Sequence, residues 1–159
     1  LEAECWSLLG EIYHFMGKYE SSYMAYEKAL AIADSNDSAV ILNNYAYFMA
    51  LRGQNLEKCL SMSKKSLEME PNNKAYLDTY GYILFRMGQY KEAKQYIERA
   101  LELSGTEDPD ILEHYGDILF MENNIDEAVK YWKTAREKGS KSKLLDRKIQ
   151  ERRLINEEK

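Results

Sequence analysis

The sequence predicts an all-α protein built as a tandem array of antiparallel helix pairs. Small residues recur about every 35 residues along the chain. The apolar residues between them follow the three-to-four-residue spacing of a helix, and strand-like alternation is absent. Most of the eight glycines and both prolines stand at the ends of the apolar stretches or at recurring small positions, which indicates helices separated by turns.

Three columns of small residues define the repeat. The first column follows a large apolar residue at intervals of 36, 35 and 35 residues, and the other two recur at 37, 34 and 35. The columns are Gly10, Ala46, Gly81 and Gly116; Ser22, Cys59, Ala93 and Ala128; and Ala29, Ser66, Ala100 and Ala135. Three independent columns with one period are hard to obtain by chance. They predict four repeats within a single array, over about residues 3–36, 38–72, 74–107 and 109–142.

Each repeat is expected to hold two helices joined by a short turn. The four turns are predicted at residues 17–19, 53–56, 88–90 and 123–125. Glycine or asparagine stands in each turn, because a helix commonly ends with a residue in the left-handed conformation, which costs these two least.

The starts of the helices and the end of the array are also marked. Asp108 before Pro109 is a helix cap followed by a first-turn proline, and Asn124 is expected to begin the next helix. Residues 71–73 separate the second and third repeats, and residues 37–38 are expected to lengthen the preceding link. Apolar residues amid charges over about 142–156 predict a helix that caps the array with a polar outer face.

The residues in these columns resemble the tetratricopeptide repeat (TPR) family. The first repeat carries part of its signature at Trp6, Leu9, Gly10, Tyr13, Tyr26 and Ala29. The third and fourth repeats carry it at Leu77, Tyr80, Gly81, Leu84, Ala93, Ile97 and Ala100, and at Leu112, Tyr115, Gly116, Leu119, Ala128, Trp132 and Ala135. The family's closing proline survives only as Pro71. The resemblance implies a right-handed superhelix of about four repeats plus the capping helix.

The resemblance also implies a binding surface, because the first helix of each TPR pair lines a concave groove. The positions that correspond to groove residues include Glu4, Ser7 and Val40, and the main candidates are Glu11, His14, Asn43, Tyr47, Asp78, Tyr82, Phe85, Arg86, Glu113, Asp117 and Phe120. A groove of carboxylates and aromatic rings favours a basic or amphipathic peptide. The alternative is that the charges form an ordinary solvated face and the rings form core between repeats.

Composition argues against several other functions. The formal net charge of −5 gives no general attraction for nucleic acid. A basic C-terminal segment is interpreted as solvated helix surface, because acidic residues interrupt it; its basic residues are Arg136, Lys138, Lys141, Lys143, Arg147, Lys148, Arg152 and Arg153. No apolar run is long enough to insert into a membrane.

No cofactor, metal site or catalytic group is predicted. The two cysteines and two histidines form no metal-binding or catalytic motif. Cys59 stands in a small-residue column, so a buried and unreactive thiol is expected. The sequence therefore predicts a protein-binding module and not an enzyme.

A structural scaffold with an idle groove is the alternative function. In that case the chain is an assembly segment of a larger bacterial repeat protein, and self-association remains an option. The many tyrosines resemble repeat arrays of envelope-associated proteins, which suggests a periplasmic or envelope location for the full-length protein. Because the chain opens at Leu1 within helical sequence, it is expected to be a fragment of a longer one.

Overall fold

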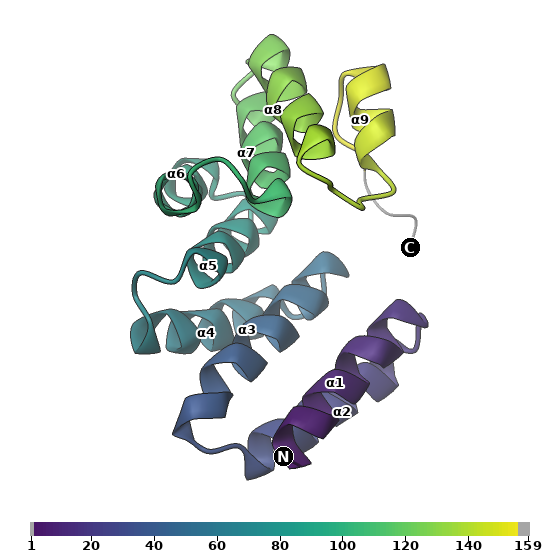
Figure 1. Cartoon of the computed structure of the whole chain (residues 1–159), viewed down its shortest axis with the longest axis vertical. Helices are drawn as coiled ribbons and strands as arrows, with labels where there is room; N and C mark the ends of the chain where they lie inside the picture. The colour runs from purple at the N-terminus through teal and green to yellow at the C-terminus, as the bar shows by residue number, and fades with distance from the viewer. Residues whose placement is uncertain (1, 156–159) are drawn as a thin grey trace. The chain divides into compact units, whose positions relative to one another are not determined.

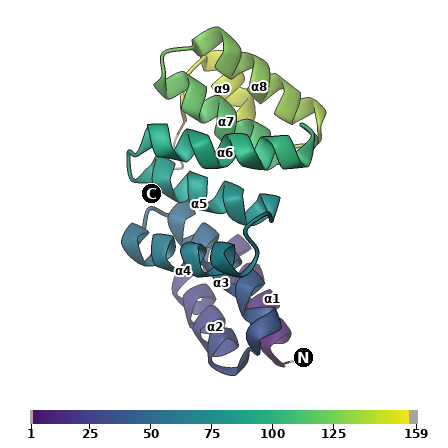
Figure 2. The same cartoon turned by 90° about the vertical axis from the view of Figure 1, so that its left-hand side faces the viewer.

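The computed structural model describes residues 2–155, and these residues form helices and connecting turns without strands. The helices are α1 (Glu2–Phe15), α2 (Tyr19–Ile32), α3 (Ser35–Leu51), α4 (Leu56–Met69), α5 (Lys74–Arg86), α6 (Tyr90–Ser104), α7 (Pro109–Met121), α8 (Ile125–Glu137) and α9 (Leu145–Glu151). The all-α class is confirmed. Figures 1 and 2 show the succession of helix pairs followed by α9.

The chain divides into two compact units, which are described separately. The first unit ends at Pro71 and contains the pairs α1–α2 and α3–α4, with α3 also against α1 and α2. The second begins at Asn72 and contains α5–α6 and α7–α8, with α9 packed on α8. Within each unit, helices that follow one another in the sequence lie side by side (Figure 2).

Close contact within the pairs depends on the small residues. All twelve residues of the three columns are buried. A methyl group added at Gly116 would lie 2.6 Å from the Trp132 ring, and one at Gly81 would lie 2.6 Å from Ile97. At these two positions the absent side chain on the first helix makes room for a large one on the second. The second repeat departs from this pattern, since Ala46 stands at the glycine position and the small Ser63 at the large one.

The turns have the predicted conformation. Gly17, Gly53, Gly88 and Asn123 stand at equivalent places after the first helices, and all four have positive φ. Asp108 caps α7 by accepting hydrogen bonds from the backbone N–H groups of Asp110 and Ile111. Asn124 precedes α8, but its side chain makes no capping hydrogen bond.

Two boundaries differ from expectation. The side chain of Asp34 accepts hydrogen bonds from the backbone N–H groups of Asn36 and Asp37, so α3 begins at Ser35. Residues 37–38 therefore extend α3 and do not lengthen the link. The capping helix is also shorter than the predicted 142–156: α9 begins at Leu145 and ends before Arg152, which is left-handed, and residue 156 lies outside the described residues.

Candidate functional site

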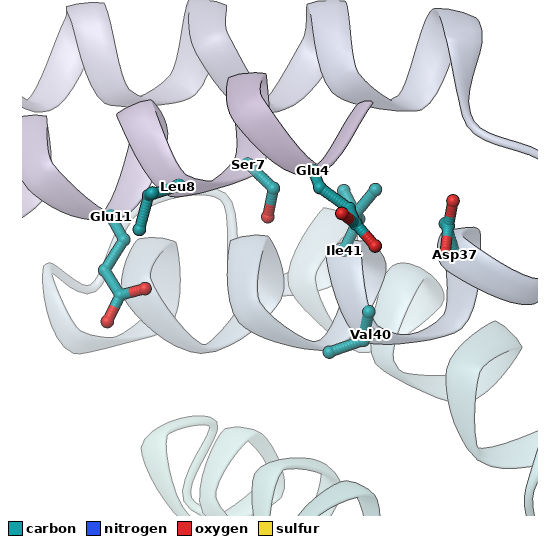
Figure 3. Close-up of a pocket in the computed structure, with 7 residues that line it drawn as sticks. All are labelled: Glu4, Ser7, Leu8, Glu11, Asp37, Val40 and Ile41. Carbon is teal, nitrogen blue, oxygen red and sulfur yellow. The ribbon is translucent and has the colours of Figure 1, made fainter. Parts of the chain in front are cut away.

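An open pocket lies between α1 and α3 in the first unit. Its volume is about 200 Å³, and it is lined by Glu4, Ser7, Leu8, Glu11, Asp37, Val40 and Ile41. Ser7 and Leu8 stand three and four residues after Glu4, and Glu11 follows them at the same two spacings, so the four residues share one face of α1. Figure 3 shows Glu4 and Asp37 towards one end of the pocket and Glu11 at the other.

The pocket combines exposed apolar surface with unpaired carboxylates. Leu8 is 57% exposed and Val40 is 44% exposed, whereas Ile41 is buried beside them. Within residues 2–155, the side chains of Glu4 and Glu11 form no ion pair, and neither does that of Asp37. The pocket can therefore offer an apolar contact flanked by negative charge.

Three other predicted groove residues of the first unit lie outside this pocket. His14 packs in an aromatic cluster, with its ring centroid 4.3 Å from that of Phe48, and burial followed by the charge of Arg52 lowers its pKa. Tyr47 is half-buried, with its ring centroid 6.0 Å from that of Phe48. Asn43 is buried, and its amide donates to Asn44 Oδ1 at 3.2 Å. His14 is thus a half-buried member of an aromatic cluster that also includes the exposed Phe15.

In the second unit, the predicted groove residue Asp78 forms a buried ion pair with His114, which the repeat pattern does not select as a groove residue. Asp78 on α5 and His114 on α7 are both more than 90% buried, with His114 Nδ1 2.9 Å from Asp78 Oδ1. Burial alone would lower the pKa of His114, but the Asp78 carboxylate outweighs it and raises that pKa to about 9. His114 is therefore a cation at neutral pH.

A second buried ion cluster joins α7 to α9. Lys148 Nζ lies 3.0 Å from Glu113 Oε1 and 3.0 Å from Asp117 Oδ1, and all three side chains are about 90% buried. Burial alone would lower the pKa of Lys148, but the two carboxylates outweigh it and raise that pKa. Asp117 also accepts a 3.0 Å hydrogen bond from Trp132 Nε1. The two carboxylates predicted for this part of the groove thus share one cationic partner within the chain.

The remaining candidates pack against their neighbours in the second unit. The Tyr82 ring stacks on His114 with centroids 4.6 Å apart, and its hydroxyl accepts a hydrogen bond from Arg86 at 3.4 Å. Phe85 lies against Tyr90, with ring centroids 5.3 Å apart. The half-buried Phe120 stacks on Trp132, with ring centroids 6.1 Å apart. Tyr82 and Phe120 thus stack on residues that contact the buried carboxylates, whereas Phe85 packs on Tyr90.

The structure corrects the interpretation of one basic residue, and it also shows three pocket residues that the sequence does not predict. The sequence places Lys148 within a solvated basic segment, yet this residue is only 6% exposed. Leu8, Asp37 and Ile41 line the pocket although the repeat pattern does not select them. The position of Leu8, four residues after Glu4 and three before Glu11 on one helix, is the available signal for it.

The described residues give no support for chemistry at the Cys59 thiol, for a metal site or for a membrane-spanning helix. Burial raises the pKa of the Cys59 thiol to about 11, and the thiol donates a hydrogen bond to Gln54 O at 3.4 Å. Among residues 2–155, no group of three or more His, Cys, Asp or Glu side chains is arranged to hold a metal ion. Over the same residues, no helix has the length and apolar character needed to cross a membrane.

Comparison with known sequences identifies the repeat. The model of the cytochrome c-type biogenesis protein H TPR domain matches residues 2–111. The TPR repeat-containing protein PA4667 of Pseudomonas aeruginosa is 31% identical to the chain over 71 residues. That match covers 45% of this chain but only 12% of the relative, so the chain corresponds to a small part of that protein.

Comparison with solved structures supports the same fold. PilW, a type IV pilus biogenesis factor, has a TM-score of 0.73 at 22% identity, covering 94% of this chain and 70% of PilW. Pseudomonas aeruginosa PilF has a TM-score of 0.68 at 21% identity, covering 89% of this chain and 63% of PilF. MamA from AMB-1 has a TM-score of 0.63 at 20% identity, covering 86% of this chain and 78% of MamA. At these identities the likeness establishes the fold alone.

Arrays of this kind are in general non-catalytic modules for protein interaction or assembly, and they use extended surfaces built by successive repeats. The predicted repeat family is confirmed by the family match and by the structures. The chain belongs to the family of cytochrome c-type biogenesis protein H TPR domains.

Proposed function

We propose that the chain is a binding module that holds a basic or amphipathic segment of another protein in the pocket between α1 and α3. The observation that carries this proposal is the exposed Leu8 and Val40 flanked by carboxylates that form no ion pair within the described residues. An apolar side chain of the ligand would cover Leu8, and a lysine or arginine beside it would approach Glu4 or Glu11. Exposed carboxylates of this kind mainly steer and select partners.

The second unit contributes less free charge to this function. Its carboxylates Asp78, Glu113 and Asp117 already have cationic partners, so a ligand there would have to compete with His114 or Lys148. The α1–α3 pocket has no such competitor among the described residues. This difference is why the proposal places the ligand in the first unit.

A structural scaffold is the second candidate function. It is favoured by exposed apolar residues on α1, on α2 and in the turn between them, away from the pocket: Phe15 is 72% exposed, Met16 57% and Met24 61%. Such surface is typical of a face that another helical element covers. The relatives named for cytochrome c-type and type IV pilus biogenesis support an envelope setting for either function.

Two matched substitutions separate the candidates. Leu8→Asp places a charge in the pocket, whereas Met24→Asp places the same charge on α2, and both residues are about 60% exposed. Each intact chain is used as bait in extract of the native organism, and a partner retained by the unmodified chain is then purified for titration. Binding lost with Leu8→Asp and kept with Met24→Asp is expected. The opposite result would support the scaffold, and equal binding by both variants would refute the pocket.

A further inference from the structure

The contact between α9 and α7 shows how this chain binds a short amphipathic helix. Lys148 of α9 stands between Glu113 and Asp117 of α7, with one hydrogen bond to Glu113 and two to Asp117 of 3.0–3.1 Å. Leu145, one turn earlier on α9, is fully buried. One lysine and one leucine at a three-residue spacing therefore provide most of the buried part of the helix.

The α9 helix is held more weakly than the helices before it. It has only seven residues, begins without a side-chain cap, and ends at a left-handed Arg152. A helix of this length is not stable alone, so it persists only through its contacts. Its other contacts are the packing of the partly buried Ile149 against the apolar cluster of the second unit and the exposed ion pairs of Arg136 with Asp146 and of Arg152 with Asp126. Exposed ion pairs of this kind contribute little.

The buried Lys148 cluster does not compensate for this small apolar contact. The cost of removing three charges from water offsets much of their attraction, so a buried ion pair adds little net stability. Detachment of α9 would return Glu113 and Asp117 to solvent and uncover part of the apolar cluster that contains Trp132, while the contact of Gly116 with Trp132 belongs to the α7–α8 pair. Local opening of this kind is expected first where few apolar groups are buried.

We propose that the surface of α7 beneath α9 is a binding site for a lysine-bearing amphipathic helix of a partner protein, and that α9 occupies this site until the partner replaces it. The ligand needs a lysine at the place of Lys148 and an apolar residue three positions earlier. This site is in the second unit and is independent of the α1–α3 pocket. The α9 helix thus acts as an internal competitor that sets the affinity of the site.

A peptide with the sequence of residues 142–155 is a suitable probe, because it contains the contacting residues of α9. In the unmodified chain the tethered α9 competes at an effective concentration on the order of millimolar, so the peptide should bind poorly. In a Lys148→Glu chain, the new carboxylate faces Glu113 and Asp117 and expels α9, which opens the site to the peptide. The peptide then supplies the missing lysine from outside.

The experiment measures the anisotropy of the labelled peptide with three intact chains: unmodified, Lys148→Glu and Lys143→Glu. Lys143 is exposed in the same segment, so its variant controls for the change of net charge. The peptide should bind the Lys148→Glu chain at least tenfold more tightly than either of the others. A second peptide, with glutamate in place of the lysine, should show no such preference.

Equal affinity for the three chains would overturn the proposal, as would equal binding of the two peptides. Retained hydrogen-exchange protection of residues 145–151 in the Lys148→Glu chain would also overturn it, since α9 would then not have left. If Lys148→Glu reduces helix content, the neutral Lys148→Met chain provides the same comparison. Adding Leu8→Asp to the Lys148→Glu chain should leave peptide binding unchanged, which separates this site from the α1–α3 pocket.

Discussion

Replacing Asp78 by asparagine should remove most of a pH-dependent part of the stability of the second unit. The folded pKa of His114 is about 9, against an ordinary value of 6.5. Each unit of difference corresponds to about 1.4 kcal/mol, so the protonated pair contributes about 3 kcal/mol relative to a neutral His114.

The sign follows from the raised pKa. The stabilisation is fully present below pH 6.5, where His114 is protonated in the folded and the unfolded chain, and it is lost as pH rises through 9. The free energy of unfolding should therefore fall by about 1.4 kcal/mol per pH unit within this window. In Asp78→Asn the slope should be much smaller, since the carboxylates that remain near His114, those of Asp117, Glu113 and Asp110, act on it more weakly than Asp78 does.

Urea unfolding followed by Trp132 fluorescence measures how the free energy of unfolding of the second unit changes with pH. Trp6 and Trp132 are the two tryptophans, so a Trp6→Phe background leaves a single reporter, which is in the second unit. Other groups that titrate in this range are common to both chains and cancel in the difference. Parallel pH profiles for the chains with and without Asp78→Asn would refute the assignment of the slope to this ion pair.

Four further substitutions test the packing, the caps and one hydrogen bond. Gly116→Ala should destabilise the chain by about 1–3 kcal/mol, although alanine has the better helix propensity. The added methyl group would lie 2.6 Å from Trp132 and 3.1 Å from a backbone carbonyl oxygen on α8. A rise in the melting temperature would contradict this prediction. Asp108→Ala should cost about 1 kcal/mol, while Asn124→Ala, whose side chain forms no cap, should cost almost nothing in the same urea titration; equal losses would be inconsistent with the observed caps. Tyr45→Phe removes a 2.8 Å hydrogen bond to a carboxylate on α2 and should cost about 1 kcal/mol, and no change in chemical denaturation would show that the bond contributes nothing.

The helix pairs could be predicted from sequence because their causes are local and repeated. A missing side chain at Gly81 or Gly116 and a large one sixteen residues later belong to the same repeat, so the periodic pattern records both. The pattern also places the turns within the repeats, since glycine or asparagine stands where each first helix ends with a positive φ.

The environment of the charged residues could not be predicted in this way. Periodicity assigns Glu113 and Asp117 to one helix face, but it does not show that Lys148 of α9 covers that face. The start of α3 escapes prediction for a different reason. Asp34 and Asp37 are both plausible caps by residue type, and only the observed hydrogen bonds select Asp34.

The ion pair of Asp78 with His114 also limits how this array can be recombined. The contacts of Gly81 with Ile97 and of Gly116 with Trp132 are each contained in one repeat and would survive a graft of that repeat into another protein. Asp78 and His114 belong to neighbouring repeats, and both are buried. The third and fourth repeats together with α9 therefore form the smallest transplantable block of the second unit. A graft of the fourth repeat alone would separate His114 from Asp78, and it would also separate Glu113 and Asp117 from Lys148.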